Sequence, residues 1–266
     1  YEGALWLKNQ LVIGLSQSGR AADAMEVLSR ARACGAVTAA ITNEPESPMV
    51  SCAEFHLDCS MGPEKSVAAT KTFIGELYLV LSLVAKWSGN ALLRNELKHI
   101  PQVIEKTYKQ AEMIEQAAGR YRFIQDSFVL GRGFAYPIAL EFALKTQETC
   151  YIRSRGYATS DFYHGPVAQV SDGTPVFQFA LGEKLTEDSV KMIDRLHQAG
   201  GDVFVFTQDA AVLAKADSGV LLPECDEICA IFAASAAMQM FACALSTLRG
   251  LNPDNPRGLS KVTITK

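Results

Sequence analysis

Short hydrophobic runs alternate with longer segments of helical character along this chain. Several runs are apolar at consecutive positions and rich in β-branched and aromatic residues, which is typical of parallel strands covered by helices on both faces. Such strands alternating with helical segments predict βαβ units around parallel sheets. The expected strands are residues 11–15, 36–42, 55–59, 128–131, 175–181, 202–207 and 219–222.

A long helical stretch, from about residue 66 to residue 119, separates these strands into two groups. Each group contains a strand that ends in a glycine-containing polar turn before a helix, LVIGLSQSG in the first and FVLGRG in the second. This weak internal repeat predicts two doubly wound α/β subdomains, residues 1–119 and 120–266. The first reaches a core strand almost at once, so we expect it to be incomplete on its N-terminal side.

One uncharged segment, residues 228–248, is long enough to consider as a membrane helix. It consists mostly of Ala, Ser, Cys, Met and Gln, it follows Asp226 and Glu227, and it ends before Arg249 and Gly250. These flanking residues are typical of a globular helix. We therefore expect a buried core helix and no membrane partner.

Composition narrows the function classes. The 266 residues have a formal net charge of -4 and no strong basic cluster, which argues against a nucleic-acid partner. No secretory signal is visible at the N-terminus, so we expect a cytoplasmic protein. The seven cysteines are an odd number in a large apolar chain and predict buried thiols in a reducing compartment. Cys225 and Cys229 lack a second ligand pair, so we expect no metal.

The SQSG turn at Ser16, Gln17, Ser18 and Gly19 is the first candidate for chemistry, because it follows a predicted strand and precedes a helix beginning near Ala21. Hydroxyls and backbone N–H groups at a helix N-terminus suit a phosphate monoester. Ser and Gly are also common capping residues without any ligand. The turn alone leaves both interpretations open.

A second candidate is PEKSVAATKTF, in which Ser66 is expected to cap the long helix and the N–H groups of Val67 and Ala68 can meet ligand oxygens. A helix cap beside a solvated lysine, Lys71, explains the same residues.

The segment after FVLGRG is more informative. Its helix carries Glu141, Lys145 and Glu148, and the spacing of Lys145 and Glu148 places a cation and a carboxylate on one face. A surface ion pair is the alternative. His164 follows in a His-Gly-Pro turn, with a side chain suited to proton transfer or to a structural role. Lys261 lies in the C-terminal tail after a Pro-Gly turn.

These motifs, in this order, resemble the sugar isomerase (SIS) family, and within it the isomerase domain of glucosamine-6-phosphate synthase. The resemblance covers nearly the whole chain. It rests on SQSG, on VAATK for the family's VASTK, on LGRGFAYPIALEFALKTQE, on HGP and on NPRGLSK.

The resemblance implies two three-layer α/β/α subdomains, a sugar phosphate as ligand, no cofactor and a homodimer. Glu148 would be the base that moves a proton between C1 and C2, and Lys145 would stabilise the enediolate. His164, from the neighbouring subunit, would help to open the sugar ring, and Lys261 would form a Schiff base with the ketose. The implied substrate-binding residues are Ser16, Gln17, Ser18, Val67, Ala69 and Ser260.

The sequence departs from the synthase pattern at four positions: Ala21 replaces a threonine, Ala69 a serine, Gln147 a lysine and Ser260 an alanine. We also see no glutamine-hydrolysing module. Without a tethered ammonia source, we expect an amino-sugar-phosphate deaminase or fructosamine phosphate deglycase, with a simple aldose-ketose isomerase as the nearest variant. A sugar-phosphate sensor is the alternative from another class, although pure binding would not require the catalytic set.

Overall fold

The computed structural model describes residues 6–261, and its strands form two parallel sheets within that range. The chain divides into two compact units, one made of Tyr1–Asn90 with Arg257–Lys266 and the other of Ala91–Pro256. The division differs from the boundary expected after residue 119. Residues 91–119 group with the second unit and the C-terminal tail with the first. The predicted N-terminal incompleteness concerns residues outside the described range.

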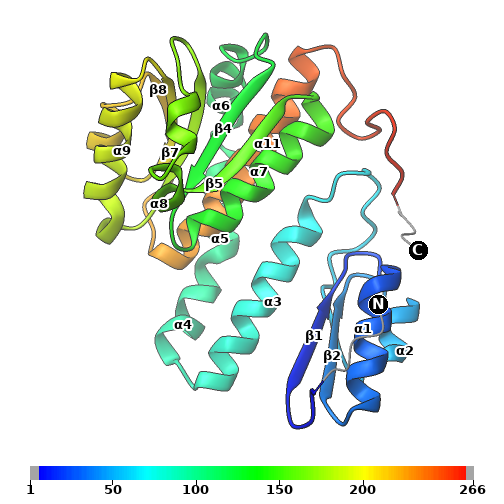
Figure 1. Cartoon of the computed structure of the whole chain (residues 1–266). Helices are drawn as coiled ribbons and strands as arrows, with labels where there is room; N and C mark the ends of the chain where they lie inside the picture. The colour runs from blue at the N-terminus through cyan, green and yellow to red at the C-terminus, as the bar shows by residue number, and fades with distance from the viewer. Residues whose placement is uncertain (1–5, 262–266) are drawn as a thin grey trace. The chain divides into compact units, whose positions relative to one another are not determined.

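The first unit contains a three-stranded parallel sheet of order β1-β2-β3 (Figure 1). All three strands lie where the hydrophobic runs predicted them. Leu28 of the first helix packs with Ala40 and Met49 in a small core. The elements are β1 (Leu11–Leu15), α1 (Ala22–Ala33), β2 (Val37–Thr42), α2 (Pro48–Cys52), β3 (Phe55–Asp58) and α3 (Lys71–Ser88).

The helical stretch after this sheet is broken into several helices, and its expected start is wrong. Helix α3 begins at Lys71, with Thr70 as N-cap, so Ser66 does not cap it. Gly89 ends α3 in the left-handed conformation, at φ 68°, which glycine adopts without steric cost. The next elements are α4 (Ala91–Glu96), the 3-10 helix η1 (Leu97–His99), α5 (Ile100–Tyr108) and α6 (Ala111–Gly119).

The second unit contains a five-stranded parallel sheet of order β5-β4-β6-β7-β8. Four of its strands were predicted, and β5 was missed. The sequence of β5, RSRGYA, is polar because it forms an edge of the sheet and only part of it is buried. The strands are β4 (Asp126–Gly131), β5 (Arg153–Ala158), β6 (Pro175–Ala180), β7 (Asp202–Thr207) and β8 (Ser218–Leu221).

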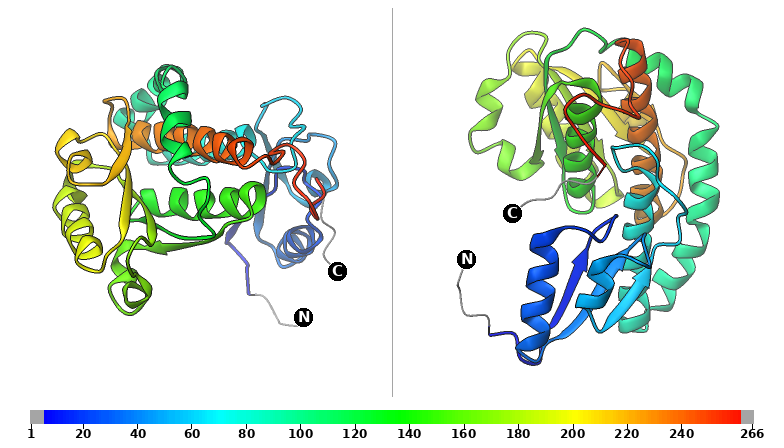
Figure 2. Two further views of the ribbon diagram at one scale, coloured as in Figure 1. Left: turned by 90° about the horizontal axis from the view of Figure 1, so that it is seen from above. Right: turned by 90° about the vertical axis from the view of Figure 1, so that its right-hand side faces the viewer.

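Helices cover both faces of this sheet, as the views in Figure 2 show. The remaining elements are α7 (Ala135–Cys150), α8 (Thr159–Phe162), η2 (Pro166–Gln169), η3 (Glu183–Leu185), α9 (Thr186–Gln198), α10 (Ala210–Leu213) and α11 (Glu227–Leu248). An aromatic core packs Phe142 of α7 and Phe241 of α11 against Phe177 of β6, with ring centroids 5.2 to 5.6 Å apart. On the other face of the sheet, Val176 of β6 and Val203 of β7 form a second core cluster with Met192 and Leu196 of α9.

Helix α11 confirms the expectation of a buried core helix. It is long and apolar enough to cross a membrane, yet 72% of its most apolar window is buried within the protein. The side chain of Asp226 caps it by accepting a hydrogen bond from Cys229 N at 2.8 Å. This packing accounts for its hydrophobicity.

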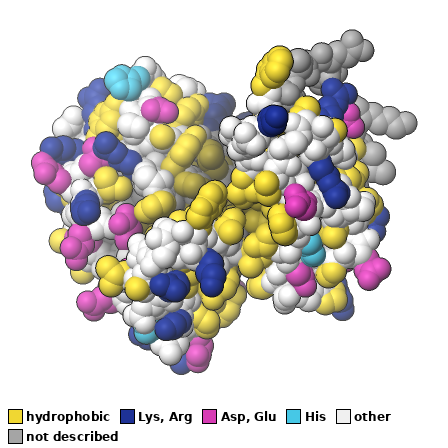
Figure 3. All heavy atoms as spheres, turned by 90° about the horizontal axis from the view of Figure 1, so that it is seen from below, with side chains coloured by type: hydrophobic (Ala, Val, Ile, Leu, Met, Phe, Trp, Pro, Cys, Tyr) yellow, Lys and Arg dark blue, Asp and Glu magenta, His cyan; other side chains and the backbone are white. Residues whose placement is uncertain are grey.

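The cysteines, all within the described residues, are free thiols. The expectation that all are buried is wrong for Cys34 and Cys243, which are exposed. Cys34 ends the surface helix α1. Large apolar side chains are exposed too, among them Tyr78, Val84 and Trp87 of α3. Figure 3 shows exposed hydrophobic side chains on one face of the molecule.

Candidate functional site

The SQSG turn lies at the carboxyl end of β1 and directly before α1. Ser16 N donates to Ile41 O of the neighbouring strand at 3.1 Å, and Gly19 N donates to Ser16 Oγ at 3.1 Å. The N-cap of α1 is Ala21, and no side chain caps the helix there. Ser16, Gln17 and Ser18 are therefore not caps of α1, which favours the anion-binding interpretation over the capping one.

Gly19 makes this turn possible. Its φ is +59°, and a Cβ atom at this position would come within 2.0 Å of Ser47 Oγ, so only glycine fits. Ser47 itself is buried, and its hydroxyl has no hydrogen-bond partner among the described residues. Sequence reasoning missed Ser47, because nothing in the pattern places it beside the turn.

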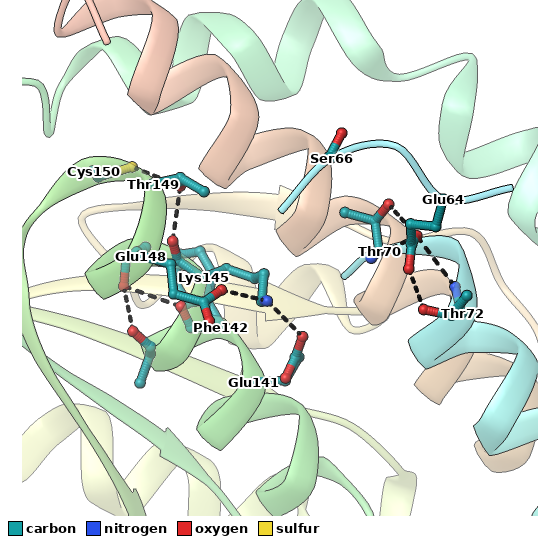
Figure 4. A network of polar contacts seen from close by, with 12 residues as sticks. Glu64, Ser66, Thr70, Thr72, Glu141, Phe142, Lys145, Glu148, Thr149 and Cys150 are labelled. Atoms are coloured by element: carbon teal, nitrogen blue, oxygen red, sulfur yellow. Dashed lines mark hydrogen bonds and ion pairs between the residues drawn. The ribbon is translucent and has the colours of Figure 1, made fainter. Parts of the chain in front are cut away.

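A buried carboxylate, Glu64, organises the loop that carries Val67 and Ala69. Its side chain is 3% exposed and accepts hydrogen bonds from Thr70 N at 3.0 Å and from the hydroxyl of Thr72 (Figure 4). Burial raises the pKa of Glu64, but the hydrogen bonds from Thr72 and Thr70 and the charge of Lys261 outweigh this effect and lower it. Glu64 is therefore an anion that holds the start of α3, the role expected of Ser66.

Lys261, although far away in the sequence, contacts this same loop. Its Nζ donates to Ser66 O at 2.6 Å and lies 4.0 Å from Glu64 Oε2. Its neighbour Ser260 is exposed, and Val67 and Ala69 are partly buried. The first unit thus brings the tail lysine to the loop with the residues that were predicted to line the sugar.

Helix α7 carries the second group of candidates. Lys145 Nζ lies 2.6 Å from Glu148 Oε2 and 3.5 Å from Glu141 Oε1, and Figure 4 shows both carboxylates pointing to this ammonium. The Lys145 side chain is 5% exposed, against 13% for Glu141 and 24% for Glu148. A surface ion pair is thus excluded, since the cation is buried. Glu148 is the more accessible of the two carboxylates.

The backbone is closely constrained at both ends of α7. At the start, a Cβ on Gly131 would come within 2.4 Å of Ala135 O, so the close approach of strand and helix requires glycine. At the end, Tyr151 adopts a left-handed conformation with φ 56°, three residues after Glu148. Gln147, one of the four departures from the synthase pattern, donates to Ser154 O of β5 at 2.7 Å and so links α7 to the sheet.

His164 is exposed on the turn after α8, and its backbone N–H donates to Asp161 O at 3.1 Å. No hydrogen bond or ion pair joins it to Glu141, Lys145 or Glu148 among the described residues. Its predicted role therefore remains a prediction.

The chain matches the family model of the SIS domain over residues 4–86 and 125–249. It belongs to the SIS domain family. Two relatives are similar to it, the glutamine--fructose-6-phosphate aminotransferases [isomerizing] of Aquifex aeolicus, 34% identical over 259 residues, and of Escherichia coli, 33% identical over 265 residues. Each alignment covers 96% of this SIS chain. The chain spans 43% and 44% of the length of those proteins.

Solved structures agree with this assignment. The C-terminal domain of glucosamine-fructose-6-phosphate aminotransferase from Francisella tularensis superposes with a TM-score of 0.87 and 26% identity, covering 96% of this chain and 76% of that chain. Glucosamine-6-phosphate deaminase from Thermotoga maritima gives a TM-score of 0.78 at 22% identity, covering 99% of this chain and 77% of that chain. The latter similarity concerns the fold alone, and the expected SIS-type fold is confirmed.

Proposed function

We propose that this SIS chain is an enzyme of amino-sugar metabolism that acts on a phosphorylated amino sugar by enediol proton transfer. The reaction favoured is glucosamine-6-phosphate to fructose-6-phosphate plus ammonia, or the corresponding reaction of a fructosamine phosphate. The family membership and the names of the relatives support a phosphosugar ligand. The observation that supports enediol proton transfer is the buried charge cluster of α7, formed by Glu141, Lys145 and Glu148.

A binding protein would not need this cluster. Burying an ammonium costs free energy, and a helix gains nothing from it that an apolar side chain would not provide. Buried titratable groups with a specific charge partner are typical of active sites. The more accessible carboxylate, Glu148, is suited to take a proton from one carbon and return it to the next, and Lys145 offsets the negative charge of the enediolate.

In this proposal the SQSG turn holds the phosphate, with Ser16, Gln17 and Ser18 donating hydrogen bonds, while Val67, Ala69 and Ser260 line the sugar. The uncapped start of α1 supports this role, because a helix N-terminus attracts anions. Lys261 adds through Nζ to the ketose carbonyl and water leaves, which gives an imine.

We further propose a homodimer in which His164 of one subunit serves the other subunit's site. The exposure of His164 supports this, because a side chain that acts across an interface has to lie at the surface of its own subunit. Sedimentation of the chain, combined with activity of mixed subunits, tests it. A fully active monomer would contradict the proposal.

The decisive experiment measures ammonia release and ketose formation across a panel of hexosamine and fructosamine phosphates. We expect Glu148→Gln to lower turnover by about 10² to 10⁴, the usual contribution of a general base, with little change in affinity. Glu105→Gln, the same change at an exposed glutamate of α5, is the matched control. Full activity of Glu148→Gln with loss of activity in Glu141→Gln would reassign the base. Tight binding of the whole panel without turnover would favour a sensor.

A further inference from the structure

The tail lysine and the loop before α3 are joined by one buried carboxylate. Glu64 accepts four hydrogen bonds, from the N–H and the hydroxyl of both Thr70 and Thr72. Thr70 and Thr72 follow Ser66 in the sequence, whereas Glu64 precedes it. The Glu64 side chain therefore links the start of the loop to its end, and these hydrogen bonds close residues 64–72 into a ring.

This ring presents a carbonyl to the tail. Ser66 O accepts a hydrogen bond from Lys261 Nζ at 2.6 Å, and the Glu64 carboxylate faces the same ammonium from 4.0 Å. The Lys261 side chain is 27% exposed, so it is only partly withdrawn from solvent. A partly exposed cation held by one carbonyl and one buried anion has a defined position that a free tail lysine would lack.

We propose that Glu64 is a positioning residue for Lys261. It holds the loop in the shape that offers Ser66 O to the ammonium, and its charge attracts the same group. Glu64 is 3% exposed and accepts four hydrogen bonds from its own loop, so in this proposal it acts through Lys261 and not on the substrate. The inference rests on the proposed function to the extent that Lys261 is taken as the amine that forms the imine.

The variant Glu64→Gln tests this, because the amide keeps the shape of the side chain and removes its charge. Glu46→Gln, an identical change at an exposed glutamate of the same unit, is the matched control. The first measurement is the rate at which borohydride traps Lys261 as its reduced adduct with saturating fructose-6-phosphate, located by peptide mass mapping. The second is the affinity for inorganic phosphate, and the third is the melting temperature.

We expect the trapping rate of Glu64→Gln to fall about tenfold, the effect of losing one charge-assisted contact, while phosphate affinity changes less than twofold. Glu46→Gln should match the wild type in both. A purely structural role would lower the melting temperature and leave the trapping rate of the folded, saturated protein unchanged. That result would overturn the proposal.

A further measurement separates this inference from the proposed function. If the wild-type chain gives no adduct at Lys261, the proposed imine does not form. The positioning role of Glu64 is then tested by a reaction that needs no substrate. Reductive methylation of Lys261 by formaldehyde and cyanoborohydride should be faster in Glu64→Gln than in Glu46→Gln, because the ammonium is released from the loop. Equal methylation rates would overturn the positioning role.

Discussion

Replacement of Lys145 by methionine tests the charge cluster of α7 directly. The side chain is 5% exposed, and Nζ lies 2.6 Å from Glu148 and 3.5 Å from Glu141. At an effective dielectric constant of about 20, these distances correspond to Coulomb attractions of about 6 and about 5 kcal/mol. Removing the buried ammonium also removes its desolvation cost, and broken buried pairs lose about 3 to 5 kcal/mol in net stability.

The lower end of this range applies, because Glu148 keeps 24% of its side chain exposed and water can compensate part of its charge. For a unit of this size, a loss of about 3 kcal/mol lowers the melting temperature by about 6 to 12 °C. Differential scanning calorimetry of the wild type and Lys145→Met measures the change. Adding Glu148→Gln to Lys145→Met should recover part of the loss, since one uncompensated carboxylate is removed.

Lys109→Met is the matched control, because Lys109 pairs with Glu105 at 3.2 Å on an exposed helix surface, where both side chains are at least 70% exposed. The free energy of unfolding of Lys109→Met should lie less than about 1 kcal/mol below that of the wild type. If Lys145→Met melts within about 2 °C of the wild type, the buried Lys145 ammonium does not stabilise the protein as expected. The cluster would then be solvated in the protein.

Three further outcomes are expected. Gly19→Ala should cost about 1 to 3 kcal/mol and weaken phosphate binding, because φ is +59° and the new Cβ meets Ser47; chemical denaturation and phosphate titration measure both. The pKa of Glu64 is lowered in the folded state, so it contributes stability above its unfolded pKa and loses it as pH falls through the folded value. The stability difference between wild type and Glu64→Gln should therefore shrink from pH 7 to pH 3 in urea unfolding, and a constant difference would contradict this. Burial raises the pKa of Cys59 to about 11, so iodoacetamide at pH 8 should alkylate the exposed Cys34 first, as mass spectrometry can show.

Much of the fold follows from local patterns. Buried parallel strands such as β2 and β7 are apolar on both faces, so their residues alone predict them. The cluster of α7 follows from helical periodicity, which places Glu141, Lys145 and Glu148 on one face wherever the helix lies. The motifs, read with the family resemblance, predicted the phosphosugar class.

Other features depended on how distant segments pack. The edge strand β5 has no hydrophobic signature, because it pairs with a neighbouring strand, β4, along one edge only and is only partly buried. Helix α3 begins at Lys71 because Glu64 reaches its first turn, which no cap pattern at Ser66 indicates. The burial of Lys145 separates a functional cluster from a surface ion pair, and spacing alone cannot distinguish the two. Lys261 meets Ser66 across 195 residues of sequence, and only the path of the chain brings them together. Local patterns report what lies on one helix or strand, whereas contacts between separate elements are decided by tertiary packing.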